Sequence, residues 1–181
     1  MFDFSKNYFD LFGLPASYVV DLGALSKRYR ELQKRVHPDR YASGTEQEQR
    51  LALQQATRVN EAFETLRDPL KRALYLLQVN GIDTDRETAT TRDGAFLMQQ
   101  MELREALEDV RAQQDPLAAL DQLMAQIGGL LNDQVAQLSM QFENATPEQL
   151  EAARESVSKM QFLTKLQLEA EALEAALEEN D

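Results

Sequence analysis

Val36-His37-Pro38-Asp39-Arg40 is the stretch that decides the fold, because it lies between two amphipathic segments and holds the only histidine of the chain. On both sides of it apolar side chains recur at steps of three and four, which is typical of helices with one buried face. The stripe before it comprises Leu22, Leu25, Tyr29, Leu32 and Val36. The stripe after it comprises Ala52, Ala56, Val59, Phe63 and Leu66. The pattern predicts two antiparallel helices joined by a loop that starts at His37.

The composition of the 181 residues excludes several classes of protein. Apolar residues make up 43% of the chain and are patterned, which predicts a globular protein. There is no cysteine and only one histidine, so we expect no disulfide, no metal site and no cofactor. No apolar run approaches the roughly 20 residues of a membrane span, and residues 1–4 do not resemble a secretory signal. We therefore expect a cytoplasmic protein.

The net charge of −12 is distributed unevenly along the chain. Residues 1–80 carry 12 Lys+Arg against 10 Asp+Glu, whereas residues 81–181 carry 7 against 21. The acidic half argues against nucleic acid and anionic membranes as partners, because both are themselves negatively charged. The uneven distribution predicts two modules with different protein partners.

Helix start and stop signals divide the rest of the chain. Asp21 is a candidate N-cap, Thr45 and Glu48 have the spacing of a capping box, and Asp68-Pro69 separates two helices. Residues 81–92 are polar and predict a linker. Three further helices are predicted, over about 93–114, from Pro116, and from Pro147 to about Glu179. We expect an all-α protein with a helical module at 1–80, a linker at 81–92 and a three-helix bundle at 93–181.

The helix before His37 has a basic side. At 100° per residue, its cations project away from the apolar stripe; they are Lys27, Arg28, Arg30, Lys34 and Arg35. Such a face is most often only solvated. Because Glu31 is the only acid among them and the chain is acidic, the excess favours docking on an acidic protein surface. His37 itself is either a cation near the carbonyls of the helix end or a catalytic base, and catalysis has little support because no serine, second histidine or acid pair accompanies it.

The helix that starts near Asp93 has apolar residues on two faces. Phe96, Leu103, Leu107 and Val110 form its core face. Leu97, Met98 and Met101 lie more than a quarter-turn away, in the sector of Glu102, Glu105, Glu108 and Asp109. They either pack on a neighbour or form an exposed apolar patch with an acidic rim, which is the form of a protein-binding surface.

The last helix carries two apolar stripes, which are rotated by about half a turn. Leu150, Ala153 and Val157 form the first stripe, and the second comprises Leu166, Ala170, Leu173 and Leu177. The change falls near Met160 to Leu163. Phe162 therefore belongs either to the core or to an external patch, and the periodicity leaves both alternatives open.

Residues 7–79 resemble a J-domain. The resemblance rests on the placement of His-Pro-Asp, on Tyr8-Phe9-Asp10-Leu11-Phe12-Gly13-Leu14, and on the run from Val59 to Pro69. It implies that this module engages an ATP-driven chaperone and stimulates its ATP hydrolysis. The positions that match the family's docking residues are His37, Pro38 and Asp39, with Lys27, Arg28, Arg30, Lys34 and Arg35 as further candidates. Arg40 stands where lysine is commoner in the family, and the charge is kept.

The whole chain resembles the HscB family, the J-type co-chaperones of iron–sulfur cluster assembly. The stretches that carry this resemblance are 91–93, 95–105 and 162–166. It implies an L-shaped, non-enzymatic monomer whose bundle binds the scaffold protein IscU and whose J-domain recruits the chaperone HscA. The scaffold-binding surface of the family falls on Leu97, Met98, Met101, Glu102, Glu105, Asp109 and Phe162. The alternatives are a general holdase that uses the same patch, a hydrolase that uses His37 and Asp39, and a purely structural assembly factor.

Overall fold

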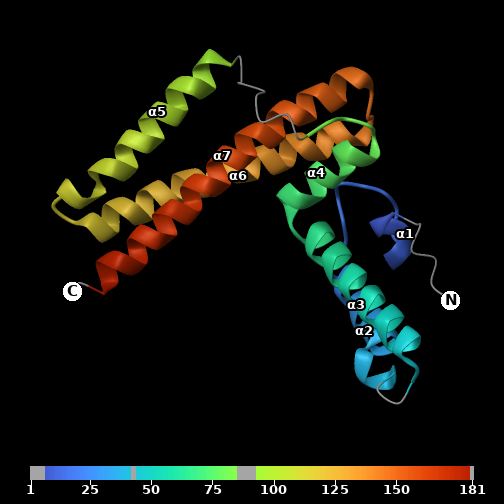
Figure 1. Ribbon diagram of the computed structural model, residues 1–181. Helices are drawn as coiled ribbons and strands as arrows, with labels where there is room; N and C mark the ends of the chain where they lie inside the picture. The colour runs from blue at the N-terminus through green and yellow to red at the C-terminus, as the bar shows by residue number, and fades with distance from the viewer. Residues whose placement is uncertain (1–6, 42–43, 85–92, 180–181) are drawn as a thin grey trace. The chain divides into compact units, whose positions relative to one another are not determined.

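The computed structural model describes residues 7–41, 44–84 and 93–179, and every regular element within these ranges is a helix. The all-α prediction is therefore confirmed (Figure 1). The chain divides into two compact units, Met1–Gly81 and Ile82–Asp181. We call them unit 1 and unit 2. Of the predicted linker, residues 85–92 lie outside the described part of the chain.

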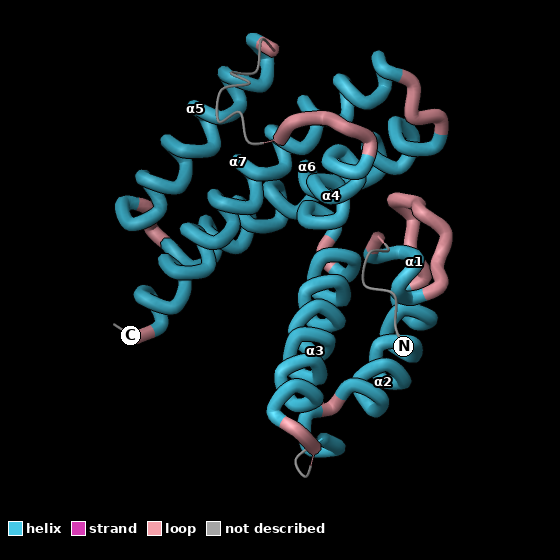
Figure 2. The backbone as a smooth tube through the Cα atoms, turned by 45° about the vertical axis from the view of Figure 1, so that its right-hand side comes forward, coloured by secondary structure: helices cyan, strands magenta, loops and turns pink. Residues whose placement is uncertain are grey.

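Unit 1 is built on a helical hairpin. Its elements are α1 (Tyr8–Phe12), α2 (Leu22–Val36), the 3₁₀-helix η1 (Pro38–Tyr41), α3 (Glu46–Arg67) and α4 (Pro69–Val79). Figure 2 shows α2 and α3 side by side, joined at one end by η1 and the residues after it. The predicted stripes form much of the core, with Leu25, Val36, Val59 and Leu66 almost fully buried. Leu22, the first residue of α2, is instead 49% exposed.

The predicted helix caps of unit 1 are confirmed. The carboxylate of Asp21 accepts from the Ala24 N–H at 2.9 Å at the start of α2. Thr45 and Glu48 form the reciprocal capping box of α3. Asp68 ends α3 and caps α4, with Pro69 as the first helical residue. Each cap satisfies N–H groups that a helix start leaves without a partner.

A buried cation fixes the segment before α2. The Arg72 guanidinium donates to the Leu66 carbonyl at 2.5 Å and lies 5.0 Å from the centre of the Tyr18 ring. Burial lowers the pKa of Arg72 and raises the pKa of Tyr18 to about 12. The Tyr18 hydroxyl therefore stays protonated near neutral pH, and the contact joins the α1–α2 connection to α4.

Unit 2 consists of three helices and one short turn. They are α5 (Gly94–Asp109), the 3₁₀-helix η2 (Val110–Ala112), α6 (Pro116–Glu143) and α7 (Pro147–Glu178). The first helix ends at Asp109 and not at Gln114 as predicted, because the chain tightens into η2 before the next helix starts at Pro116. The two glycines at 128 and 129 do not interrupt α6. α6 and α7 form a long antiparallel hairpin, and α5 packs beside its open end (Figure 1).

The core of unit 2 explains the two stripes of the last helix. In the second half of α7, Leu163, Leu166 and Ala170 share a cluster with α5 and α6, through residues such as Leu103 and Ile127. In the first half, the stripe of Leu150, Ala153 and Val157 is buried as well. The buried face of α7 rotates because α5 packs on this helix only from about Lys159 onward.

Candidate functional surfaces

The His-Pro-Asp loop follows directly from the end of α2. Proline disfavours helical backbone angles in the residue that precedes it. For this reason α2 ends at Val36, and His37 takes an extended ψ of 127°. The 3₁₀-helix η1 then starts at Pro38 and carries Asp39. The side chains of Pro38 and Arg40 lie outside the described part of the structure.

His37 contacts Asp39 in two ways. The Asp39 backbone N–H donates to His37 Nδ1 at 3.3 Å, and an Asp39 carboxylate oxygen lies 3.5 Å from the same nitrogen. Neutral imidazole accepts the N–H bond, whereas protonated imidazole pairs with the carboxylate. The Asp39 side chain is 90% exposed in either case. The geometry thus leaves this carboxylate open to solvent, beside the His37 ring.

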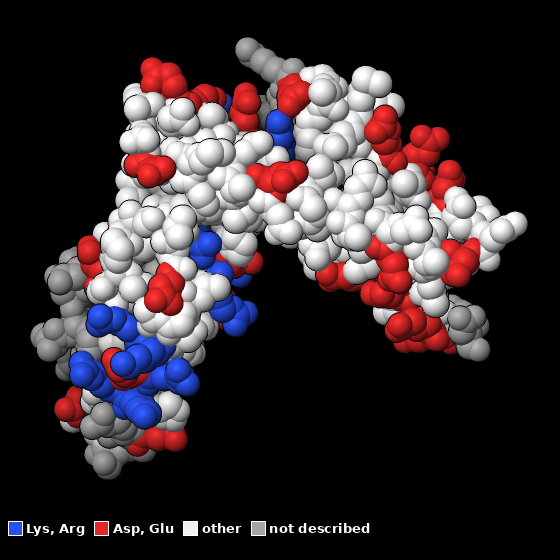
Figure 3. Space-filling model, turned by 180° about the vertical axis from the view of Figure 1, so that it is seen from behind, with Lys and Arg blue, Asp and Glu red and all other residues white. Residues whose placement is uncertain are grey.

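The basic side of α2 is a solvent-exposed surface. All five cations predicted to face away from the core are exposed, namely Lys27, Arg28, Arg30, Lys34 and Arg35. Figure 3 shows Lys and Arg side chains gathered on one part of unit 1, whereas acidic side chains predominate on unit 2. Arg28 and Arg35 also border a groove of about 290 Å³ between α1 and α2, beside Leu11 and Gly13. We call these five cations the α2 surface.

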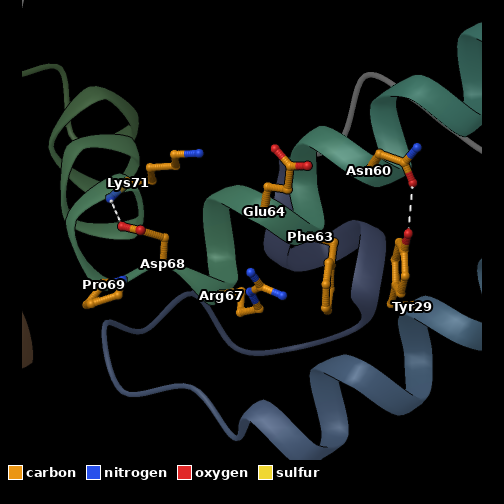
Figure 4. A pocket seen from close by; sticks show the side chains of 8 residues that line it. All are labelled: Tyr29, Asn60, Phe63, Glu64, Arg67, Asp68, Pro69 and Lys71. Atoms are coloured by element: carbon orange, nitrogen blue, oxygen red, sulfur yellow. Dashed lines mark hydrogen bonds between the residues drawn. The ribbon is translucent and has the colours of Figure 1, made fainter. Parts of the chain in front are cut away.

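Unit 1 has a second groove, which the sequence did not predict. It has a volume of about 590 Å³ and is lined by Tyr29, Asn60, Phe63, Glu64, Arg67, Asp68, Pro69 and Lys71. Figure 4 shows the rings of Tyr29 and Phe63 stacked, with centroids 4.0 Å apart, and Arg67 on the other side of Phe63. The Tyr29 hydroxyl donates to Asn60 at 3.0 Å. Both rings belong to the apolar stripes of their own helices, and periodicity does not show that they stack on each other.

The outer face of α5 is exposed. Met98 and Met101 are 65% and 72% exposed, and Leu97 is 38% exposed. Glu102, Glu105 and Asp109 are exposed on the same side of the helix. Of the two alternatives for the apolar residues, the structure therefore shows the exposed patch with an acidic rim. We call these six residues the α5 surface.

Phe162 lies on a different helix from the residues of the α5 surface. It belongs to α7, is half-buried and packs against the core cluster of unit 2. Its ring meets the buried Phe96 of α5 edge-on, with centroids 6.0 Å apart, and the Arg104 guanidinium lies 6.0 Å from its centre. Of the two alternatives left open by the periodicity, the structure thus shows contact of Phe162 with the core, and its part in an external patch stays a prediction.

Two ion pairs hold α5 against α7. Lys159 Nζ lies 2.6 Å from the Asp93 carboxylate, and Arg104 lies 3.0 Å from Glu169. The hydrogen bond from Lys159, together with that from the Phe96 N–H, lowers the pKa of Asp93. The partners are more than 60 residues apart in sequence, so periodicity offered no signal for these pairs.

Other kinds of site find no support in the described residues. No group of three or more His, Cys, Asp or Glu side chains in 7–41, 44–84 and 93–179 is arranged to hold a metal ion. Within the same ranges, no helix combines the length and the apolar character that crossing a membrane would require.

Two family profiles match the chain, one for each unit. Residues 7–75 match the DnaJ domain, and residues 92–171 match the family described as the HSCB C-terminal oligomerisation domain. The boundary between the matches falls close to the division between units 1 and 2.

Individual proteins match almost the whole chain. The co-chaperone protein HscB homolog of Shewanella loihica is 44% identical over 171 residues, which cover 94% of this chain and 99% of that protein. The solved structure of the chaperone HscB from Vibrio cholerae has a TM-score of 0.84 and 42% identity, covering 95% of this chain and 99% of that one. The crystal structure of human co-chaperone protein HscB has a TM-score of 0.85 and 30% identity, covering 94% and 83%. With a J-domain in unit 1 and the matching helical domain in unit 2, the chain belongs to the HscB family of co-chaperones.

Proposed function

We propose that a single copy of this chain is a non-enzymatic adaptor between an IscU-type scaffold protein and an HscA-type ATP-driven chaperone. The α5 surface and Phe162 bind the scaffold. The His37-Pro38-Asp39 loop and the α2 surface dock on the chaperone and stimulate its ATP hydrolysis. The adaptor thereby assists the transfer of iron–sulfur clusters and the maturation of the proteins that carry them.

The exposure of Met98 and Met101 is the observation that carries this proposal. An amphipathic helix normally turns its apolar residues to the core, and α5 already does so with Phe96 and Leu103. Apolar side chains that remain exposed within an acidic rim have the composition of a protein-binding surface. Methionine is flexible and polarisable, and therefore suits contact with an irregular protein surface.

The loop of unit 1 supports the other half of the proposal. An exposed carboxylate on a short turn, next to exposed cations, can engage a charged partner without rearrangement of the hairpin. Binding both partners to one chain raises the concentration of the scaffold at the chaperone, because the second contact becomes intramolecular. The catalytic groups for ATP hydrolysis belong to the chaperone.

The steady-state ATPase rate of an HscA-type chaperone tests this function. The chain and the scaffold protein are added alone and together. We expect the two together to stimulate far more than the sum of their separate effects. Stimulation that is indifferent to the scaffold would contradict the assignment of unit 2, and equal binding of unrelated denatured proteins would favour a general holdase.

A further inference from the structure

A cleft lies beside the first half of α5, where this helix meets α6 and α7. It has a volume of about 460 Å³ and is lined by Asp93, Ala95, Phe96, Met98, Gln99, Glu102, Gln134 and Lys159. Met98 and Glu102 also belong to the α5 surface, so the cleft opens next to the proposed scaffold site. A protein bound on α5 is therefore within reach of it.

Gln134 is the unusual residue of this cleft. It is only 8% exposed, and its Oε1 atom is buried with no hydrogen-bond partner among the described residues. Leaving a buried amide oxygen unpaired destabilises a fold, and most buried polar groups have partners. The terminal torsion of a glutamine is soft, so rotation of the amide can turn this oxygen toward the cleft that Gln134 lines. This acceptor is available to a donor that comes from outside the chain.

The charges around the cleft select the kind of donor. Lys159 is already paired with Asp93 at 2.6 Å, and its ammonium lies 5.3 Å from the centre of the Phe96 ring. Its charge is thus largely compensated. Glu102 is exposed and has no ion-pair partner among the described residues. Besides the paired Asp93, the cleft therefore offers the Glu102 carboxylate and one neutral acceptor, between the apolar walls of Phe96 and Met98.

We propose that this cleft takes a long basic side chain, arginine or lysine, from the protein that binds the α5 surface. Its methylene stem lies against Phe96 and Met98, as such stems commonly pack on apolar surface. Its cationic head lies between Glu102 and Gln134, where hydrogen bonds to a charged donor are stronger than those between neutral groups. The inference rests on the proposed function, since it names part of what the scaffold presents.

Substitutions at Gln134 test the proposal through scaffold affinity, measured by titration calorimetry with an IscU-type scaffold at low and high salt. Gln134→Leu removes the acceptor, and we expect affinity to fall about tenfold. The same variant should raise the midpoint of thermal unfolding, because an unpaired buried amide is replaced by an apolar group of similar size. Gln134→Glu should tighten binding at low salt, and this gain should shrink at high salt. A glutamine with only a structural role would not move affinity and stability in opposite directions.

Two further variants show whether the effects at Gln134 come from the cleft. Gln137→Glu makes the same change of charge at an exposed position one turn further along α6, and should leave affinity within about twofold. Glu102→Gln changes an exposed residue, so its effect does not depend on whether the fold tolerates a buried charge. This variant should weaken scaffold binding and reduce the salt dependence of that binding.

The outcomes separate this inference from the proposed function. Unchanged affinity in Gln134→Leu would overturn the inference, as would weaker binding by a fully folded Gln134→Glu variant. If Met98→Ala with Met101→Ala abolishes binding in the same experiment, the proposed function stands without the cleft. Absence of scaffold binding by the unchanged chain would overturn both.

Discussion

The α2 surface and the α5 surface differ in the physical means by which they can bind. The α2 surface is a set of exposed cations beside one exposed carboxylate, whereas the centre of the α5 surface is apolar and only its rim is charged. Interactions between exposed charges are screened by salt, but burial of apolar area is not. The comparison predicts that contact with the chaperone is salt-sensitive and that contact with the scaffold depends mainly on shape and apolar area.

The largest effect is expected from Asp39→Asn, which removes the charge of the carboxylate presented by the loop. Stimulation of the chaperone ATPase should fall to the unstimulated rate, because no neighbouring acid of the loop can replace Asp39. Scaffold affinity should remain within about twofold, since Asp39 belongs to unit 1 and the residues proposed to bind the scaffold belong to unit 2. Steady-state ATPase assays and calorimetry on the same preparation measure both quantities. Asp133→Asn, at an exposed position of α6, is the matched control. Parallel loss of both properties would show that the surfaces are not separate.

The second effect is expected from Met98→Ala combined with Met101→Ala. Scaffold affinity should fall by roughly 10- to 100-fold, as for loss of well-packed apolar contacts at an interface. The free energy of unfolding should change by less than about 1 kcal/mol, because both side chains are exposed in the free chain. Met140→Ala removes an equally exposed methionine, 64% against 65% for Met98, and should leave affinity unchanged. Similar losses from Met98 and Met140 would indicate nonspecific apolar binding.

The third effect is the dependence on salt that distinguishes the two surfaces. Lys27→Ala with Arg30→Ala should weaken coupling to the chaperone several-fold at low ionic strength, and by much less at about 0.5 M salt, where screening is strong. The loss caused by the methionine substitutions should be nearly the same at both salt concentrations. Chaperone and scaffold affinities measured across a salt series provide the test. A scaffold affinity that depends on salt as steeply as chaperone coupling would remove the distinction.

The smallest effect concerns the ion pair that holds the start of α5. The pKa of Asp93 is lowered in the folded chain by Lys159, so the pair stabilises the fold above the unfolded pKa of about 3.9. This stabilisation is lost as the pH falls through the folded pKa. Lys159→Met should therefore lower the thermal midpoint slightly at pH 7, and the difference from the unchanged chain should shrink as the pH falls through the lowered pKa of Asp93. A difference that is constant with pH would assign the effect to packing on Phe96 and not to charge.

The sequence was sufficient to predict the features that depend on neighbouring residues. The caps at Asp21, Thr45 and Asp68, the end of α2 before Pro38 and the outward position of Met101 all follow from local spacing. These features need only the helical period and the hydrogen bonds of helix ends.

Features that depend on packing between distant helices were not predicted. The Lys159–Asp93 pair, the core contact of Phe162 and the unpaired amide of Gln134 arise where α5, α6 and α7 meet. Periodicity shows which face of a helix is apolar, but it does not show which residue of another helix stands opposite. The stacking of Tyr29 on Phe63 was not predicted for the same reason, because the two rings belong to the apolar stripes of different helices.

In the proposed function one chain holds both partners at once, and a mixing experiment can show whether it must. The Asp39→Asn variant keeps the scaffold surface, and the Met98→Ala, Met101→Ala variant keeps the chaperone surface. The ATPase rate of the chaperone is measured with scaffold and with equal amounts of the two variants. We predict no more than the sum of their separate effects, because neither variant can bring scaffold and chaperone together. Recovery of the full synergy of the unchanged chain would contradict the adaptor account.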